Sequence, residues 1–359
     1  MEIGLVGLPL VGKTTFFNLL TGASRPTGLT GETRVHTGSA PVPDKRLDFL
    51  AALYRREKIV YARVDFKDIP GLDPRQVNKA AASRFLEEVR GADALCCVVR
   101  AFTAAEIPAY FDAVSPLREF QEILAELLLA DIMLVERRLE RLRSGRKVSK
   151  EAAAEVALLE RCLATLNNEE PLEKVALSPE EKGLFAGYGF LTEKPLILAV
   201  NLDEIGLREG DHPQREALRD YVEKRGIPAV EVAAQIEAEI AKLPPEDRAE
   251  FLEDFGLEEP GIERLAKAAF RCLGLISFFT VGEAEVKAWV IKEGTTARKA
   301  AGKVHSDMER GFIRAEVFHF DDLFRFGTPA KAREAGLVRL EGKDYPVRDG
   351  DVIHFRFNV

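Results

Sequence analysis

The sequence has few cysteines, no long apolar run and no excess of positive charge. Four of its 359 residues are cysteine (Cys96, Cys97, Cys162 and Cys272), and their spacing matches no metal site. A disulfide framework or a zinc centre is therefore not expected, and reduced thiols in a cytosolic protein are the simpler interpretation. No stretch reaches the roughly 18 apolar residues of a membrane span, and no secretory signal precedes the first apolar segment. We expect a cytoplasmic protein that makes no contact with a membrane.

The charge balance is acidic, but the acidic excess is unevenly distributed. The chain carries 51 Lys and Arg against 59 Asp and Glu, a formal net charge of −8. Residues 276–359 hold 14 of the basic and 13 of the acidic side chains, so the acidic excess lies in the remainder. This balance argues against non-specific coating of nucleic acid, although a local basic face on the last third of the chain is compatible with it.

A phosphate-binding motif lies near the N-terminus. The segment Gly7-Leu8-Pro9-Leu10-Val11-Gly12-Lys13-Thr14 matches the pattern G-x-x-x-x-G-K-[ST] between a predicted strand, Ile3–Val6, and a predicted helix, Thr15–Leu20. Backbone N–H groups of such a loop and the helix N-terminus bind anions. Lys13 is expected to reach the β- and γ-phosphates as the catalytic residue, and Thr14 to bind Mg²⁺. The nucleotide-binding residues predicted here are Leu8, Pro9, Leu10, Val11, Gly12, Lys13, Thr14 and Thr15.

A second motif, Asp68-Ile69-Pro70-Gly71, follows a predicted strand. Its Asp68 carboxylate is expected to hold Mg²⁺, and the Gly71 N–H to sense the γ-phosphate. Leu72 comes next, at the position where Ras-like GTPases carry the glutamine that orients the attacking water. Leucine forms no hydrogen bond through its side chain, so unassisted hydrolysis should be slow.

A candidate base-recognition segment, Asn201-Leu202-Asp203-Glu204, ends another apolar strand. The guanine-reading motif is N-K-x-D, and here Glu204 replaces its aspartate with a side chain one methylene longer. This change weakens the prediction of guanine and permits ATP, although GTP stays open. We predict that Asn201, Leu202 and Glu204 contact the base together with Ala233, at the end of the next predicted strand.

Strand-like and helix-like segments alternate along the sequence, which predicts right-handed crossovers and a mostly parallel sheet in an α/β fold. Predicted strands are Ile3–Val6, Lys58–Asp68, Ala94–Arg100, Pro195–Asn201 and Ala229–Ala233, and predicted helices are Leu47–Tyr54, Ala80–Arg90 and Gly261–Leu273. We assign residues 1–115 and 195–273 to a P-loop nucleotide-binding domain.

Residues 117–167 have a different pattern, with apolar residues recurring every three to four positions on both sides of a Ser144-Gly145-Arg146 break. This period predicts an antiparallel helical hairpin inserted into the sheet domain, within residues 116–194. Residues 276–359 carry short strand-like runs, which predict a small α+β domain. The runs are Ser277–Thr280, Val286–Val290, Ile313–Val317, Asp344–Val347 and Val352–Phe357.

Taken together, these segments resemble the YchF-type Obg-like ATPases over nearly the whole chain. The shared features are the two phosphate motifs, Asn201–Glu204, the run Gly256–Gly261, and the C-terminal segments Ala301–Asp307, Glu341–Tyr345 and Phe357–Val359. The resemblance implies a C-terminal TGS-like (ubiquitin-like) domain, a preference for ATP, and a ribosome or other RNA-containing partner reached through the TGS-like and helical domains.

The sequence departs from the family pattern in its N-terminal half. Leu10 replaces a loop asparagine, and Ala109 stands where the family carries a histidine proposed to assist hydrolysis. The family's first switch is also altered, and Thr30 and Thr33 are the candidate Mg²⁺ contacts there. These departures indicate a divergent paralogue with weakened or retuned chemistry. We therefore expect Mg²⁺-dependent ATP binding with slow hydrolysis as a conformational switch; a translation-associated GTPase and a nucleotide-gated binding module with negligible turnover are the alternatives.

Overall fold

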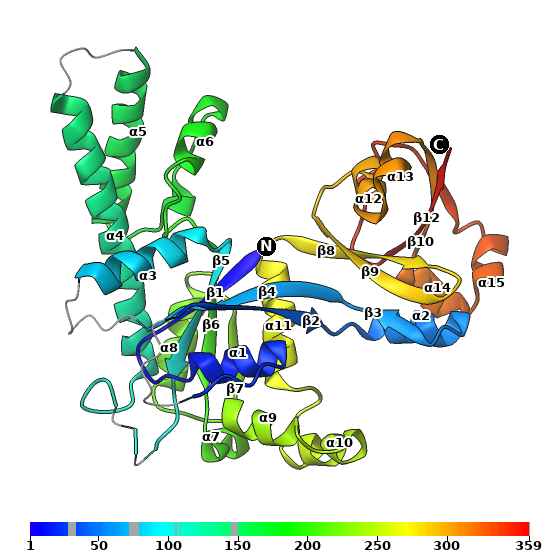
Figure 1. The fold of residues 1–359 in the computed structure, drawn as a ribbon, viewed down its shortest axis with the longest axis horizontal. Coiled ribbons are helices and arrows are strands. Elements are labelled where there is room, and N and C mark those ends of the chain that lie inside the picture. The colour runs from blue at the N-terminus through cyan, green and yellow to red at the C-terminus, as the bar shows by residue number, and fades with distance from the viewer. Residues whose placement is uncertain (28–33, 72–78, 105, 108, 145–149, 359) are drawn as a thin grey trace. The chain divides into compact units, whose positions relative to one another are not determined.

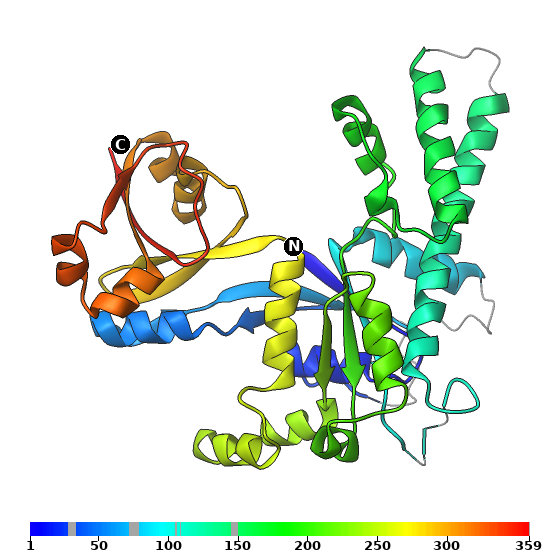
Figure 2. The same cartoon turned by 180° about the vertical axis from the view of Figure 1, so that it is seen from behind.

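The computed structural model describes residues 1–27, 34–71, 79–104, 106–107, 109–144 and 150–358 (Figures 1 and 2). The chain forms two compact units, one of Met1–Gly38 with Asp65–Leu265 and the other of Ser39–Val64 with Ala266–Val359. Thr30, Thr33 and Leu72 lie outside the described residues. No helix within the described ranges is both long enough and apolar enough to cross a membrane.

The first unit is built on a sheet with the strand order β2-β4-β1-β5-β6-β7. Its strands are β1 (Glu2–Val6), β2 (His36–Val42), β4 (Ala62–Asp68), β5 (Ala94–Arg100), β6 (Leu196–Asn201) and β7 (Ala229–Val232). All pairings between β4, β1, β5, β6 and β7 are parallel. The carboxyl ends of these strands therefore share one edge, which brings together motifs that are far apart in the sequence. The predicted α/β class is confirmed.

Helices connect and follow these strands. They are α1 (Lys13–Thr21), α3 (Lys79–Gly91), α6 (Pro179–Ala186), α7 (Glu204–Glu209), α8 (Arg215–Glu223), α9 (Ala234–Ile240), α10 (Pro245–Asp254) and α11 (Gly261–Cys272), with a short 3₁₀ turn at Leu172–Lys174. Side chains of α3 and α8 join those of β5 and β6 in one buried cluster.

The predicted helical hairpin is present as α4 (Pro116–Ser144) and α5 (Lys150–Asn167), which run side by side in Figure 1. The first turns of α4 pack into the core of the sheet through Phe120, Ile123 and Leu127. Its later turns pack against α5 in a separate cluster that includes Val135, Leu139 and the buried Cys162. One continuous helix therefore belongs to both cores.

The second unit contains a mixed sheet with the order β11-β10-β12-β8-β9-β3. Its strands are β3 (Lys58–Val60), β8 (Leu275–Val281), β9 (Glu285–Lys292), β10 (Phe312–His319), β11 (Arg339–Glu341) and β12 (Asp351–Phe357). Its helices are α2 (Lys45–Tyr54), α12 (Ala297–Val304), α13 (Ser306–Arg310), α14 (Phe320–Phe326) and α15 (Pro329–Glu334). An α+β arrangement was expected for this part of the chain.

Two expected strands differ in the structure. The single strand predicted for Lys58–Asp68 is divided, because β3 pairs with β9 in the second sheet while β4 pairs with β1 in the first. The strand predicted for Asp344–Val347 is wrong: Pro346 has no N–H for a ladder and makes only an isolated bridge. The carbonyls of Lys343 and Tyr345 instead accept the first N–H groups of α12.

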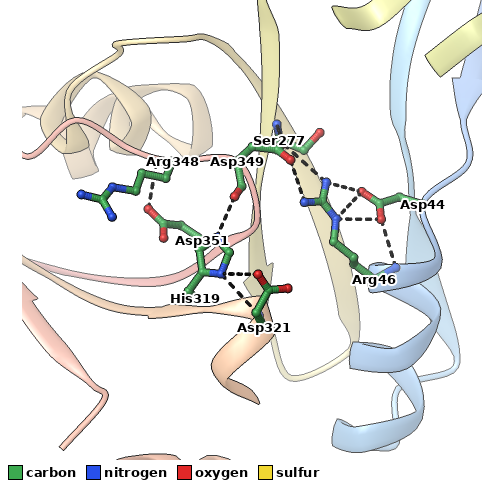
Figure 3. A network of polar contacts seen from close by, with 8 residues as sticks. All are labelled: Asp44, Arg46, Ser277, His319, Asp321, Arg348, Asp349 and Asp351. Atoms are coloured by element: carbon green, nitrogen blue, oxygen red, sulfur yellow. Dashed lines mark hydrogen bonds and ion pairs between the residues drawn. The ribbon is translucent and has the colours of Figure 1, made fainter. Parts of the chain in front are cut away.

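Residues 39–64 belong to the second unit, although they include parts of β2 and β4 of the first sheet and were expected in the nucleotide-binding domain. A polar network in Figure 3 explains part of this placement. The Arg46 guanidinium pairs with Asp44 at 2.8 Å and with Asp349 at 2.7 Å. Asp349 also accepts the Ser277 backbone N–H at 2.8 Å, so α2 is tied to β8 and to the turn before β12.

Candidate nucleotide-binding site

The loop between β1 and α1 is shaped by two glycines that allow close backbone approach. A Cβ at Gly7 would lie 2.4 Å from the Val98 carbonyl oxygen, and one at Gly12 would lie 2.4 Å from Asn201 Nδ2. Gly12 is also the N-cap of α1, with φ of 100° and no side-chain cap. The first N–H groups of α1 are thus not capped by a side chain, which suits the binding of an anion.

Lys13 is folded back into this loop. Its Nζ donates hydrogen bonds to the carbonyl oxygens of Gly7 at 3.1 Å and Leu8 at 2.8 Å. Burial lowers the pKa of Lys13 to about 8, although the charges of Asp68 and Glu119 act in the opposite direction. A phosphate bound in the loop would accept the Lys13 hydrogen bonds in place of these two carbonyl oxygens.

The second predicted motif lies against the first. Thr14 Oγ1 donates to Asp68 Oδ2 at 2.8 Å, which brings the two predicted metal ligands together. A Cβ added at Gly71 would lie 2.9 Å from Lys13 Nζ and 3.0 Å from the Pro9 nitrogen, so this turn contacts the loop directly. A hydroxyl and a carboxylate fit Mg²⁺, which takes one or two protein oxygens and completes its shell with water and phosphate.

Asn201 holds the loop from the other side. Its Nδ2 donates to the Val11 carbonyl at 2.9 Å, and its Oδ1 accepts the Ala234 N–H at 3.3 Å. Leu202 and Ala233 are buried beside it at the ends of β6 and β7. The predicted residues Asn201, Leu202 and Ala233 therefore adjoin the phosphate loop at the carboxyl edge of the sheet.

Glu204 differs from the other predicted site residues because it is exposed. Its Oε1 pairs with Arg208 Nε at 3.0 Å on the surface of α7, and both side chains are about half exposed. The preceding residue, Asp203, caps α7 by accepting the Gly206 N–H at 2.9 Å. Asp203 also accepts the backbone N–H of Thr103 at 3.0 Å, which fixes the loop that follows β5.

Two buried charged residues next to this edge, Arg100 and Glu119, are not among the site residues predicted from the sequence. Glu119 Oε2 accepts the Arg100 backbone N–H at 2.8 Å, and the Arg100 guanidinium donates to the carbonyls of Phe102 and Ile107. Burial raises the pKa of Glu119 to about 7, against the opposing effects of the Arg100 N–H, the Arg100 charge and the Lys13 charge. A signal was available, since Glu119 stands four residues before Ile123 in the apolar stripe of α4.

The raised pKa of Glu119 predicts a pH-dependent contribution to stability. The folded state keeps this proton between the unperturbed value of 4.5 and about 7, so the free energy of unfolding falls as the pH rises through this window. Glu119→Gln stays neutral throughout. Its stability relative to the wild type should therefore rise by up to about 3 kcal/mol between about pH 4 and pH 8, as measured by urea unfolding.

Glu136→Gln, at an exposed position of the same helix, is the matched control for this prediction. It reports the effect of a Glu-to-Gln change on the exposed surface of α4, and the Glu119→Gln difference should change with pH by more. A Glu119→Gln difference from the wild type that is the same at about pH 4 and about pH 8 would contradict the assignment of Glu119 as a buried titrating group.

Comparisons with known proteins find relatives over the whole chain. A family model described as a 50S ribosome-binding GTPase matches residues 2–137, and a model for the C-terminal part of YchF GTPases, described as a protein of unknown function, matches residues 275–358. The "Ribosome-binding ATPase YchF" of Haemophilus ducreyi is 41% identical over 100% of this chain and 99% of its own length. The Bacillus subtilis protein of that name is 39% identical over 100% of both chains. The solved YchF GTPase of Schizosaccharomyces pombe has a TM-score of 0.83 at 29% identity, covering 99% of this chain and 97% of that chain.

Proposed function

Because this chain belongs to the YchF family, we propose that it binds ATP with Mg²⁺ at the Gly7–Thr14 loop, hydrolyses it slowly and uses the change of state to regulate docking on the ribosome. The observation that carries the proposal is the convergence of Lys13, Thr14 and Asp68 around one loop that Asn201 fixes in place. Ribosome docking implies a cytoplasmic protein.

Each residue has a separate task in phosphoryl transfer to water. The loop N–H groups and Lys13 stabilise the negative charge on the β- and γ-phosphates. Thr14 and Asp68 would hold Mg²⁺, which offsets phosphate charge when it is bound. Gly71 lies next to Lys13, where its N–H can respond to the γ-phosphate.

Base preference depends on the Asn201–Glu204 segment and on Ala233. Both polar atoms of the Asn201 side chain are hydrogen-bonded, Nδ2 to the loop and Oδ1 to the β7–α9 turn. Asn201 therefore orients the base pocket. Glu204 replaces the aspartate that accepts two guanine hydrogens, and its carboxylate pairs with Arg208. This pairing supports ATP over GTP, since the guanine-specific acceptor is displaced toward the surface. A translation-associated GTPase is the second candidate.

Slow turnover is proposed from side chains that cannot orient water. Leu72 follows Gly71, and Ala109 and Leu10 offer no hydrogen-bonding side chain either. The alternative that these residues favour is a nucleotide-gated binding module with negligible hydrolysis.

The comparison of ATP with GTP tests the proposed base preference. Titration with labelled nucleotides and Mg²⁺ should give at least about tenfold tighter binding of ATP, the effect of one lost bidentate base contact. Single-turnover hydrolysis should exceed the buffer background and increase with ribosomes. Tighter binding of GTP would reject the adenine assignment, and a rate that never exceeds background would favour the binding module.

Docking on ribosomal RNA is proposed for the helical hairpin and for a TGS-like domain formed by residues 276–359. The exposed side chains of α12 include three cations, Arg298, Lys299 and Lys303, and no acidic residue lies on this helix. The Arg298 N–H donates to the Lys343 carbonyl, which adds a fourth exposed cation beside the helix. RNA phosphates are the natural partners of such a cluster.

Charge reversal on α12 tests this docking. Lys299→Glu with Lys303→Glu should weaken co-sedimentation with ribosomal particles at low salt by about tenfold or more, because two phosphate contacts become repulsive. The matched control reverses two exposed lysines elsewhere in the unit, Lys292 and Lys331, and should lose much less. Equal losses for the two double variants would reject α12 as the contact, and no co-sedimentation of the wild type in either nucleotide state would reject ribosome docking altogether.

A further inference from the structure

Glu119 enters the nucleotide-binding unit from the helical hairpin. It is the fourth residue of α4, and only 2% of its surface is exposed. The residues that follow it, Phe120 and Ile123, are buried with the sheet, while Val135 and Leu139 on the same helix are buried with α5. A displacement of the hairpin is therefore transmitted along one helix to Glu119.

A short series of hydrogen bonds leads from Glu119 to the phosphate loop. Glu119 Oε2 accepts the N–H of Arg100, the last residue of β5, at 2.8 Å. Arg100 is paired with Asn201 in the adjoining strand, and the next N–H, of Ala101, donates to the Asn201 carbonyl at 2.9 Å. Asn201 in turn donates to the Val11 carbonyl at 2.9 Å. The helix, two strand ends and the loop are thus connected by three hydrogen bonds.

The charge of Glu119 also bears on the loop. The charges of Glu119 and Lys13 each favour the ionised form of the other. An ionised carboxylate whose charge acts on Lys13 opposes the entry of phosphate there, because like charges in a poorly solvated site repel strongly. Glu119 has no place among the residues expected to touch nucleotide or Mg²⁺, so its influence is indirect.

We propose that Glu119 is a positioning residue of the nucleotide site, through which the helical hairpin sets the geometry and charge of the phosphate loop. The carboxylate does this in two ways, since its oxygen fixes the ends of β5 and β6 and its charge weakens the hold on phosphate. This inference rests on the proposed nucleotide-binding function. Movement of α4 would alter both effects together and so couple a partner of the hairpin to nucleotide affinity.

Two substitutions separate the two effects. Glu119→Gln keeps a side-chain oxygen for the Arg100 N–H and removes the charge, so it should bind a fluorescent ATP analogue with Mg²⁺ about fivefold more tightly than the wild type at about pH 8. Glu119→Ala loses both the oxygen and the charge, and should bind about tenfold more weakly than Glu119→Gln. Glu136→Gln, exposed on the same helix, should match the wild type.

Hydrogen exchange tests the connection to the hairpin. Addition of the ATP analogue should slow amide exchange in residues 116–135 of α4 at least about twofold in the wild type and in Glu119→Gln, and should have little effect in Glu119→Ala. Unchanged exchange in the wild type would overturn the role of the hairpin. A Glu119→Gln affinity within twofold of the wild type, or a Glu119→Ala affinity equal to that of Glu119→Gln, would overturn the positioning role.

These failures are distinguishable from failure of the proposed function. Lys13→Ala reports on nucleotide binding itself and leaves the Glu119 side chain and its hydrogen bond to Arg100 in place. If the wild type binds the ATP analogue and Lys13→Ala does not, unchanged affinities of the Glu119 variants would reject this inference and leave the proposed function intact. If the wild type binds neither ATP nor GTP, the proposed function fails and the inference fails with it.

Discussion

Lys13→Ala should lose ATP affinity by about a hundredfold or more, the largest functional effect expected for a single substitution in this protein. A lysine that meets two phosphates contributes charge-assisted hydrogen bonds of about 1.5–3 kcal/mol each, and their loss corresponds to this factor. The free protein should stay folded, because the loss of the Lys13 hydrogen bonds to the carbonyls of Gly7 and Leu8 is offset by the removal of a buried ammonium group. Equilibrium titration with labelled ATP and Mg²⁺ measures the loss.

Lys45→Ala is the matched control, since Lys45 is exposed at the start of α2 in the other unit. Its affinity should equal that of the wild type. Thermal unfolding of both variants separates lost binding from lost structure. A Lys13→Ala variant that is folded and takes up ATP as the wild type does would mean that the Gly7–Thr14 loop is not the phosphate site.

Asn201→Ala should combine a loss of stability with a loss of binding. Asn201 is only 5% exposed, and its removal leaves the Val11 carbonyl and the Ala234 N–H without their side-chain partner. Each buried unpaired group costs about 1–3 kcal/mol, so the free energy of unfolding should fall by about 2–4 kcal/mol. Nucleotide affinity should fall about tenfold or more as the loop loses its support. Urea unfolding and the same titration provide the two numbers.

Asn18→Ala provides the comparison for this second substitution. Asn18 also makes two side-chain hydrogen bonds, but both go to the exposed Arg25 backbone, at 2.9 Å each. Water can replace those partners, so the free energy of unfolding should change by less than about 1 kcal/mol. If the two asparagine variants are equally stable, the buried bridge of Asn201 contributes little.

The proposed phosphate site could be located in the sequence because the residues of its loop are local in sequence. The pattern from Gly7 to Thr14 specifies a strand, a tight loop and a helix within one short segment, and Asp68 and Asn201 each end an apolar strand. Strands of a parallel sheet present their carboxyl ends at one edge, so these separate segments were expected to meet. The structure brings Thr14, Asp68, Gly71 and Asn201 to the loop, and the family resemblance is confirmed by full-length relatives.

Residues defined by contacts between distant segments could not be predicted in this way. In the sequence, Glu119 is one of several glutamates on a charged helix. Only the packing of α4 on β5 places its carboxylate where it accepts the Arg100 N–H. Glu204 matched a base-reading position, yet its side chain pairs with Arg208 along the helix surface. Asp203 caps α7 locally, but its second role was not predicted because Thr103, whose backbone N–H it accepts, lies a hundred residues earlier in the chain.

The same division applies to the fold. Periodicity located most strands and both long helices, because burial of an apolar face leaves a repeat of two or of three to four residues in the sequence. It could not show that the segment Lys58–Asp68 divides between two sheets, since each part has the alternation of a strand whichever neighbour it meets. The amino-acid sequence by itself determined the glycine-rich loop between the first strand and helix, the class of fold and the family. Only the tertiary structure decided which strand pairs with β3, which backbone N–H bonds to Glu119 and which buried groups hold the loop, because hydrogen bonds between distant segments depend on packing that no local pattern records.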